Sequence, residues 1–308
     1  MIDAVLSALA WVGRFSDALA WLSVLTFVAG ALLAWRDSRF ARPVTVAGWV
    51  VFAAFWFSVF HHFAFVQKSI IEGVGTLVAV PASLYAGLLL ARGRDSLFVL
   101  SRAVAAMGVV FFPFESIPVL TEFLIETVTA QTAFLMGLLG ADPTVVPGTM
   151  VPSGGHPDYH STFWFVTDGH TITYTILIAC TGIGSMAIFA GLIAAADAPL
   201  SRKLRALAVS IPVIYGLNLV RNVFIGLGFG LQKFDVFPNL VMTVFGTDDP
   251  YKVSYFVADR VLAQSLSVLA LVAITWIVVR ELPEVMVVIE DVLFMATGTE
   301  YDLRGQFG

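Results

Sequence analysis

The chain consists largely of blocks of about 20 consecutive, mostly apolar residues, a length that lets a helix cross the hydrocarbon core of a bilayer. Apolar residues make up 58% of the 308 positions and charged residues 13%, whereas a soluble domain carries roughly 25% charged residues. The blocks are continuously apolar rather than alternating, which argues against a transmembrane β-barrel. We therefore predict an all-α, polytopic membrane helix bundle in which residues 1–308 form a single integral membrane domain.

Charged turns, prolines and polar loops divide the chain into seven predicted transmembrane helices. Residues 119–139 stand apart, because Glu122, Glu126 and Gln131 interrupt an apolar pattern of helical spacing. We interpret them as an extracytoplasmic amphipathic helix that lies at the interface or packs on the bundle. A polar loop over 140–170 is long enough to be functional, and a second polar loop covers 232–254. The predicted spans are 17–35, 43–66, 74–91, 96–112, 171–196, 204–231 and 255–279.

The basic residues predict how these spans are oriented. With the N-terminus outside, eleven Lys and Arg residues fall on the inner side, among them Arg304 in the tail. Only four basic residues then lie outside, namely Arg14, Lys68, Lys233 and Lys252. This orientation makes the C-terminal tail cytoplasmic and the 113–170 and 232–254 segments extracytoplasmic.

Composition narrows the chemistry that the chain can use. Its single cysteine cannot form an intrachain disulfide. No Cys/His cluster has the spacing of metal ligands, so the sequence predicts neither a metal nor another cofactor. For His61 and His62 a packing or pocket-lining role is favoured over haem or metal ligation, because no further ligand follows at helical spacing. The net charge of −5 forms no basic stripe, which argues against nucleic acid as a partner.

A thiol and two permanent charges, Cys180, Arg221 and Arg260, lie inside the last three predicted spans. An ionisable residue at membrane depth is a functional-site hypothesis by default. Cys180 lies about nine residues, or about 13 Å, below the outer end of its span. Arg221 lies about ten residues deep and Arg260 about five or six. All three are therefore predicted to meet in the outer half of the membrane, on consecutive antiparallel helices.

Each of these residues also has a purely structural interpretation. A lone buried cysteine usually packs as a small hydrophobe. Arg221 could stabilise the bundle through backbone carbonyls, and Arg260 is close enough to the surface to snorkel. The shared depth of the three residues favours a joint site over three separate packing roles.

Polar neighbours support the predicted site. Asn218, Arg221 and Asn222 share one helical face. Arg260 and Gln264 share another face at i and i+4, whereas Asp259 is predicted to point elsewhere. Small residues surround the thiol, and they allow a helix or a substrate backbone to approach closely. They are Thr181, Gly182, Gly184 and Ser185.

His170 is a weaker candidate for the same site. It lies ten residues before Cys180, on roughly the same side of the predicted span but about 15 Å away. Direct pairing of its imidazole with the thiol is therefore not expected. The aromatic stretch 159–165 is interpreted as an interfacial belt or a loop core rather than a substrate clamp.

Three motifs resemble the exosortase/archaeosortase family: A-C-T-G-I-G-S at 179–185, N-L-V-R-N at 218–222 and D-R at 259–260. The spacing, 41 residues and then 39, is most similar to the archaeosortases of haloarchaea. Bacterial exosortases carry His where Arg260 stands, which agrees with the archaeal branch. The resemblance is strong over the last three predicted spans and extends to the hydropathy layout of the whole chain.

The resemblance implies an intramembrane cysteine protease/transpeptidase of the cell membrane. Its substrates would be secreted surface proteins whose C-terminal sorting signal combines a Pro-Gly-Phe motif, a transmembrane helix and basic residues. It would cleave near the motif and link the new C-terminus to an archaeal phospholipid. Cys180 would be the acyl-thioester nucleophile, Arg221 the proton donor and Arg260 the transition-state stabiliser. Without the resemblance, the buried arginines also fit a seven-span receptor or transporter that binds an anionic ligand.

The chemistry of the predicted site follows from its charges. An apolar environment raises the pKa of a thiol, whereas a neighbouring guanidinium stabilises the thiolate. A guanidinium can also donate hydrogen bonds to the oxyanion that forms on the scissile carbonyl. The pKa of a guanidinium is too high for efficient proton donation near neutral pH. The leaving amine is therefore expected to be protonated through water or by the thiol proton relayed through polar neighbours. Asn218, Asn222 and Gln264 are candidates to orient that water.

Overall fold

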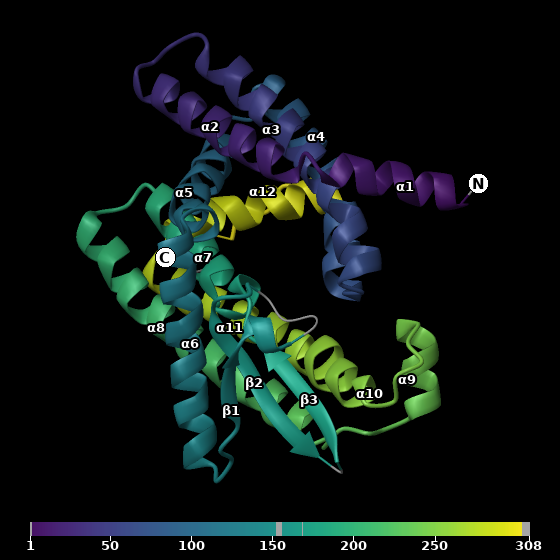
Figure 1. Ribbon diagram of the computed structural model, residues 1–308. Coiled ribbons are helices and arrows are strands. Elements are labelled where there is room, and N and C mark those ends of the chain that lie inside the picture. Colours follow the sequence, from purple (N-terminus) through teal and green to yellow (C-terminus); the bar gives the residue numbers. More distant parts are fainter. Residues whose placement is uncertain (1, 152–155, 168, 304–308) are drawn as a thin grey trace. The chain divides into compact units, whose positions relative to one another are not determined.

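The computed structural model describes residues 2–151, 156–167 and 169–303. Arg304, which the charge pattern placed on the inner side, lies outside the described residues. Positions 152–155 and 168 of the predicted 140–170 loop also lie outside them. Contacts between Cα atoms divide the chain into two compact units. The first unit holds residues 1–110, 187–207 and 276–308, and the second holds 111–186 and 208–275 (Figure 1).

Seven helical segments of the described chain are long and apolar enough to cross a membrane, which confirms the predicted polytopic helical class. The 26-residue segment Ala41–Val66 combines an α-helix with a π-helical end, and the segment Lys252–Glu281 combines α10 (Lys252–Tyr255), a π-helix and α11 (Gln264–Glu281). The other five segments are α2 (Ser16–Trp35), α4 (Ile70–Ala91), α5 (Leu97–Ser116), α6 (Pro118–Leu138) and α8 (Leu200–Gly230).

The predicted span over 171–196 is wrong. This stretch contains β3 (His170–Thr175), a short 3-10 helix (Ile178–Cys180) and α7 (Ile183–Ala195), which has only 13 residues. A helix needs about 20 residues to cross the hydrocarbon core. The alternation of Ile172 and Tyr174 with threonines is a strand period of two, and the long apolar run after it concealed that period. The predicted amphipathic helix, present as α6, completes the seven long helices instead.

A three-stranded antiparallel sheet replaces much of the predicted 140–170 loop. Its order is β1 (Thr144–Pro147), β2 (His160–Thr167) and β3. Phe163 pairs with Tyr174 and Phe165 pairs with Ile172, and all four side chains are buried. They pack with residues of α6 and α8 in the core of the second unit. The aromatic stretch of β2 is therefore core. The predicted 232–254 loop contains a helix, α9 (Pro238–Phe245).

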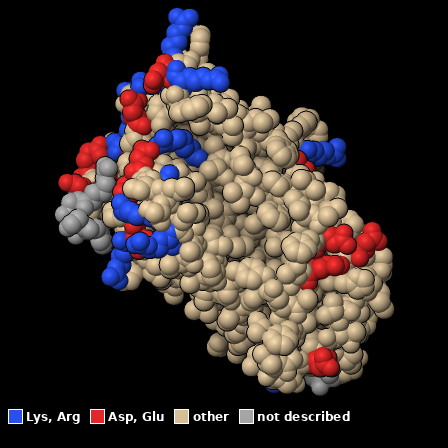
Figure 2. All heavy atoms as spheres, turned by 90° about the vertical axis from the view of Figure 1, so that its left-hand side faces the viewer, with Lys and Arg blue, Asp and Glu red and all other residues tan. Residues whose placement is uncertain are grey.

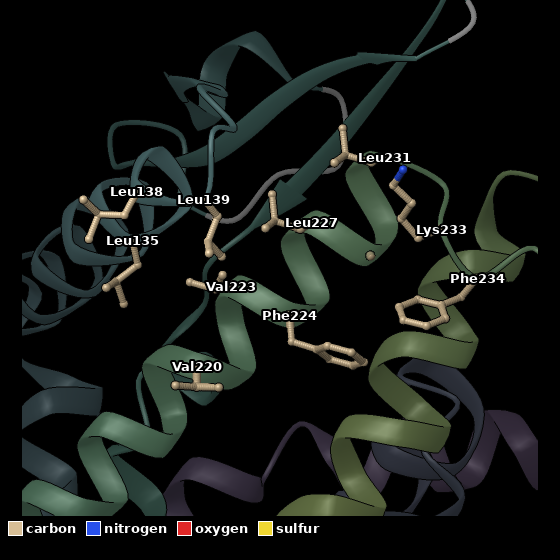
Figure 3. A pocket seen from close by; sticks show the side chains of 11 residues that line it. Leu135, Leu138, Leu139, Val220, Val223, Phe224, Leu227, Leu231, Lys233 and Phe234 are labelled. Atoms are coloured by element: carbon tan, nitrogen blue, oxygen red, sulfur yellow. The ribbon is translucent and has the colours of Figure 1, made fainter.

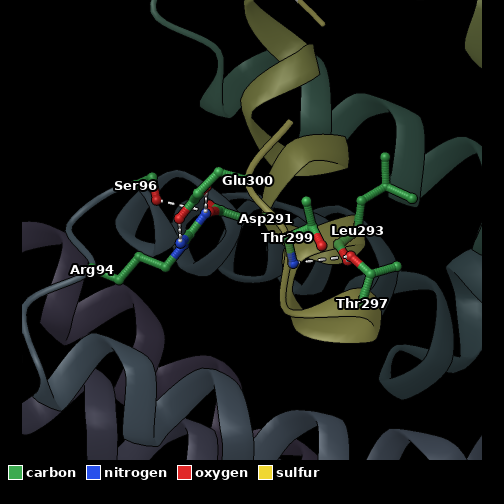
Figure 4. A network of polar contacts seen from close by, with 7 residues as sticks. All are labelled: Arg94, Ser96, Asp291, Leu293, Thr297, Thr299 and Glu300. Atoms are coloured by element: carbon green, nitrogen blue, oxygen red, sulfur yellow. Dashed lines mark hydrogen bonds and ion pairs between the residues drawn. The ribbon is translucent and has the colours of Figure 1, made fainter. Parts of the chain in front are cut away.

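The first unit contains, among others, the helices α1 (Ile2–Gly13), α3 (Ala41–His61) and α12 (Met286–Thr297). Its aromatic core includes Trp49, whose indole Nε1 donates to Ser101 Oγ at 3.0 Å. Between α4 and α5, Arg94 pairs with Asp291 of α12 at 2.6 Å and with Glu300 at 2.6 Å (Figure 4). These ion pairs attach the C-terminal segment to the turn between α4 and α5.

Charged side chains are distributed unevenly over the surface. In Figure 2 most of the visible Lys and Arg side chains lie toward the upper left, and a broad area of the face shown carries neither sign of charge. Many large apolar side chains of the long helices are exposed, for example Leu269 and Val272 of α11 at 65%. Such an apolar exterior is the surface that a helical membrane protein presents to lipid.

Candidate active site

Cys180 lies at the end of the 3-10 helix that follows β3, just before α7 begins. It is partly buried and lies outside the seven long helices. Gly182 adopts a positive φ of +81°, which favours glycine. A Cβ atom at this position would also lie 3.0 Å from Asn218 Cγ. The glycine therefore allows the turn after the thiol to pack directly on α8.

Two asparagines of α8 hold the backbone of the cysteine. The side-chain amides of Asn218 and Asn222 each donate to the Cys180 carbonyl at 2.8 Å. Asn222 is fully buried, and its Oδ1 accepts a hydrogen bond from the Tyr174 hydroxyl at 3.3 Å. The structure thus brings Asn218 and Asn222 to Cys180, where their amides donate to its carbonyl.

Asp259 connects the two arginines of the predicted site. Arg221 Nη2 donates to Asp259 Oδ1 at 2.7 Å, and Arg260 Nε lies 3.5 Å from Asp259 Oδ2. Arg260 Nη2 also donates to the Tyr255 hydroxyl at 3.2 Å. Asp259 is 5% exposed, so its carboxylate is a buried counter-charge shared by both guanidiniums.

The prediction that Asp259 points away from the site is wrong, because its carboxylate contacts both guanidiniums. Residues Phe256–Ala263 form a π-helix, in which hydrogen bonds run from i to i+5. More residues per turn reduce the angle between consecutive side chains. This change is small, and it is the observed contacts that place Asp259 and Arg260 in the same cluster. π-Helical turns are rare and occur often at functional sites.

The charges of this cluster act on the thiol. Burial raises the pKa of the Cys180 thiol, Arg221 and Arg260 oppose that rise, and Asp259 adds to it. A backbone hydrogen bond with Leu177 also favours the thiolate. Burial likewise holds the pKa of Tyr174 well above its ordinary value, so this hydroxyl stays protonated and available as a donor.

The remaining predicted residues are placed differently. His170 is exposed at the start of β3, where its ring lies 4.3 Å from that of Tyr251. About 17 Å of strand separates His170 from the end of β3 that leads to Cys180. Gln264 is the first residue of α11 and is partly buried.

Sequence reasoning missed Asp259, Tyr174 and Tyr255. A signal for Asp259 was present, because two arginines placed within apolar segments require a nearby counter-charge. The two tyrosines gave no comparable signal, because tyrosine occurs commonly in both strands and helices. Their recruitment depends on the hairpin and on the π-helix.

A groove of about 610 Å³ lies along the side of α8 that faces away from Asn218 and Asn222 (Figure 3). Val220 and Leu227 of α8 face it, as does Leu231 just after the helix, together with Leu135 and the end of α6. At about 100° per residue, these α8 positions lie opposite Asn218 and Asn222. Arg221 lies between the two faces. Among the described residues, Lys233 is the only charged one that lines the groove.

Comparison with known proteins identifies the family. A family model described as transmembrane exosortase matches residues 13–247. The chain belongs to this family. The exosortase family comprises membrane enzymes of the sortase type, and this chain is accordingly a cysteine transpeptidase that takes part in processing C-terminal sorting signals.

Two relatives refine the assignment within the exosortase family. Archaeosortase A of Haloferax volcanii is 52% identical over 306 residues, which cover 96% of this chain and 99% of the relative. Archaeosortase A of Natronomonas pharaonis is 44% identical over 290 residues, which cover 91% of this chain and 88% of the relative. No solved structure matches the chain significantly. The resemblance inferred from the motifs is therefore confirmed.

Proposed function

We propose that this exosortase-family enzyme cleaves sorting signals that combine a Pro-Gly-Phe motif with a transmembrane helix. Cys180 is the nucleophile, and the new C-terminus is transferred through a thioester to a membrane phospholipid. The likeness to two archaeosortases A supports the substrate class. The observation that carries the site assignment is the cluster itself, in which the only thiol of the chain is held by α8 beside two bridged arginines.

Charge balance supports a thiolate as the reacting form. Arg221, Arg260 and Asp259 together carry a net charge of +1 when Cys180 is protonated. Loss of the thiol proton brings the cluster to neutrality, and opposite charges nearby favour the ionised form. The thiolate is the nucleophilic form of cysteine. The two guanidiniums therefore offset part of the burial that disfavours it.

Acyl transfer then proceeds in two balanced steps. The sulfur attacks the scissile carbonyl, the C–N bond breaks, and the leaving amine takes up one proton, equal to the one that the thiol lost. Arg221 and Arg260 donate hydrogen bonds to the oxyanion, because a guanidinium retains its own protons near neutral pH. In the second step a nucleophilic group of the lipid attacks the thioester and restores the thiol.

Asn218 and Asn222 position the nucleophile in this proposal. Their amides fix the carbonyl of Cys180. The thiol therefore keeps one orientation relative to Arg221, which lies on α8 together with the two asparagines. Asp259 is a positioning residue for both guanidiniums. Fixed donors stabilise a developing charge without reorganising during the reaction.

The length of α8 supports a site in the outer half of the membrane. Arg202, Lys203 and Arg205 begin the helix, and Arg221 follows Arg205 by 16 residues, which is about 24 Å of helix. The hydrocarbon core is about 30 Å thick. With the basic end in the cytoplasm, Arg221 lies near the outer surface. We place the N-terminus outside and the C-terminus in the cytoplasm.

Mass spectrometry of the full-length enzyme with a sorting-signal substrate tests the proposal. The chain has one cysteine, so a substrate fragment linked as a thioester can be assigned to Cys180 without ambiguity. Cys180→Ala and Cys180→Ser are expected to leave the substrate uncut, whereas Leu217→Ala, on an exposed face of α8, retains processing. Normal processing by Cys180→Ala would refute the assignment of the nucleophile.

A further inference from the structure

A second groove, of about 550 Å³, lies among helix ends of the first unit. It is separate from the cluster around Cys180, because its lining belongs entirely to the other unit. Its walls come from α2, α5 and the connection between α7 and α8. The residues that the argument uses are Leu32, Trp35, Arg102, Val109, Asp197 and Lys203.

The groove is charged at one end and apolar at the other. The two helical walls, α2 and α5, pack against each other, since a Cβ at Gly108 of α5 would touch Val24 of α2. Trp35 is the last residue of α2 and is 80% exposed, as is typical of a side chain at a membrane interface. Val109 lies seven residues beyond Arg102, about 10 Å further along α5.

The charged end has an excess of positive charge. Arg102 Nη2 pairs with Asp197 at 3.1 Å, and Lys203 Nζ donates to the Ala194 carbonyl at 2.9 Å. Within the described part of the chain, the buried Nε of Arg102 has no hydrogen-bond partner. Two cations and one carboxylate leave a net charge of +1. An N–H donor and a positive charge thus border an apolar channel.

We propose that this groove binds an anionic phospholipid. Its phosphate accepts hydrogen bonds from Arg102 and Lys203, and one of its chains runs along Leu32 and Val109 into the hydrocarbon layer. Basic pockets between helix ends recognise acidic headgroups in this way, and a guanidinium matches the geometry of a phosphate. A zwitterionic lipid would bring its own cation to the same end, where the net positive charge disfavours it.

Native mass spectrometry of the full chain, released from detergent micelles, tests this site. The probes are phosphatidylglycerol and phosphatidylcholine with identical chains. The unmodified chain is expected to retain phosphatidylglycerol preferentially. Arg102→Gln is expected to weaken this binding roughly fivefold, because one basic residue near a membrane surface contributes about that factor. Arg205→Gln is the matched control, because Arg205 pairs with Glu281 and does not line the groove.

Two further variants separate a lost lipid contact from a general defect. Lys203→Gln is expected to reproduce the effect of Arg102→Gln. Val109→Trp fills the apolar end at an exposed position and is expected to weaken binding, whereas Leu25→Trp, exposed elsewhere on α2, is not. Equal retention of the two lipids would overturn the proposal. So would equal effects of Arg102→Gln and Arg205→Gln, or a dimer mass that Val109→Trp abolishes.

Discussion

Replacing Asp259 by Asn removes the negative charge between the two arginines while it keeps the size of the side chain. Asp259 raises the pKa of the Cys180 thiol, and Arg221 and Arg260 lower it. Without the carboxylate, the arginines act unopposed and the pKa falls. At a fixed pH below the thiol pKa, a larger fraction of Cys180 is then thiolate. The variant is therefore expected to react faster with iodoacetamide than the unmodified enzyme.

Turnover of the same variant is expected to fall. The Arg221–Asp259 contact is 2.7 Å long, and a hydrogen bond between charged groups is worth roughly 1.5–3 kcal/mol. In the proposed mechanism, an arginine released from this contact no longer meets the oxyanion in a fixed geometry. Loss of one such donor costs roughly a hundredfold to a thousandfold in kcat. Because the amide can still accept a hydrogen bond from Arg221, we expect about a hundredfold loss for Asp259→Asn.

The assay measures both quantities on one preparation. Alkylation of the single cysteine is followed by intact mass from pH 6 to pH 10, and processing of a sorting-signal substrate is followed by gel. Asp248→Asn is the control, because Asp248 is an exposed carboxylate of the same unit. A destabilised protein would lose both signals or expose the thiol at every pH equally. Alkylation that is unchanged or slower in Asp259→Asn would refute the electrostatic reasoning.

Three further predictions concern the residues around the thiol. Arg221→Gln is expected to shift the pH profile of Cys180 alkylation to higher pH, since Arg221 lowers the thiol pKa; an unchanged profile would exclude this role. Asn222→Ala leaves the Tyr174 hydroxyl without its acceptor and is expected to cost about 1–3 kcal/mol of stability, measured by denaturant unfolding, and to slow thioester formation. Gly182→Ala, at φ +81°, is expected to cost about 1–2 kcal/mol and to reduce turnover; an active variant of unchanged stability would contradict the packing argument.

The long apolar helices could be predicted from the sequence because a bilayer constrains their length so strongly. Residues 171–196 misled the prediction, since their mean apolarity exceeds the requirement for a span although the first part alternates as a strand. A helix that contacts lipid and a strand that is buried in a protein core have similar apolar compositions. The difference is set by tertiary packing of Phe163 and Tyr174 against α6 and α8.

The candidate site was predicted where helical periodicity holds and missed where it fails. Asn218, Arg221 and Asn222 follow a regular α-helix, so their common face could be read from spacing. Asp259 lies in a π-helix, and nothing in the local sequence of residues 256–263 distinguishes that winding from an α-helix. The contribution of Tyr174 required the strand to be known first.

The double hydrogen bond to the Cys180 carbonyl has a mechanical consequence. The main chain of Cys180, the proposed nucleophile, is bound to α8, the helix that also carries Arg221, while Asp259 belongs to another segment. If α8 tilts or rotates when a substrate enters, Cys180 and Arg221 travel together and keep their spacing. The contact that yields is the one to Asp259. Movement of α8 therefore alters the electrostatic environment of the sulfur without separating Cys180 from Arg221.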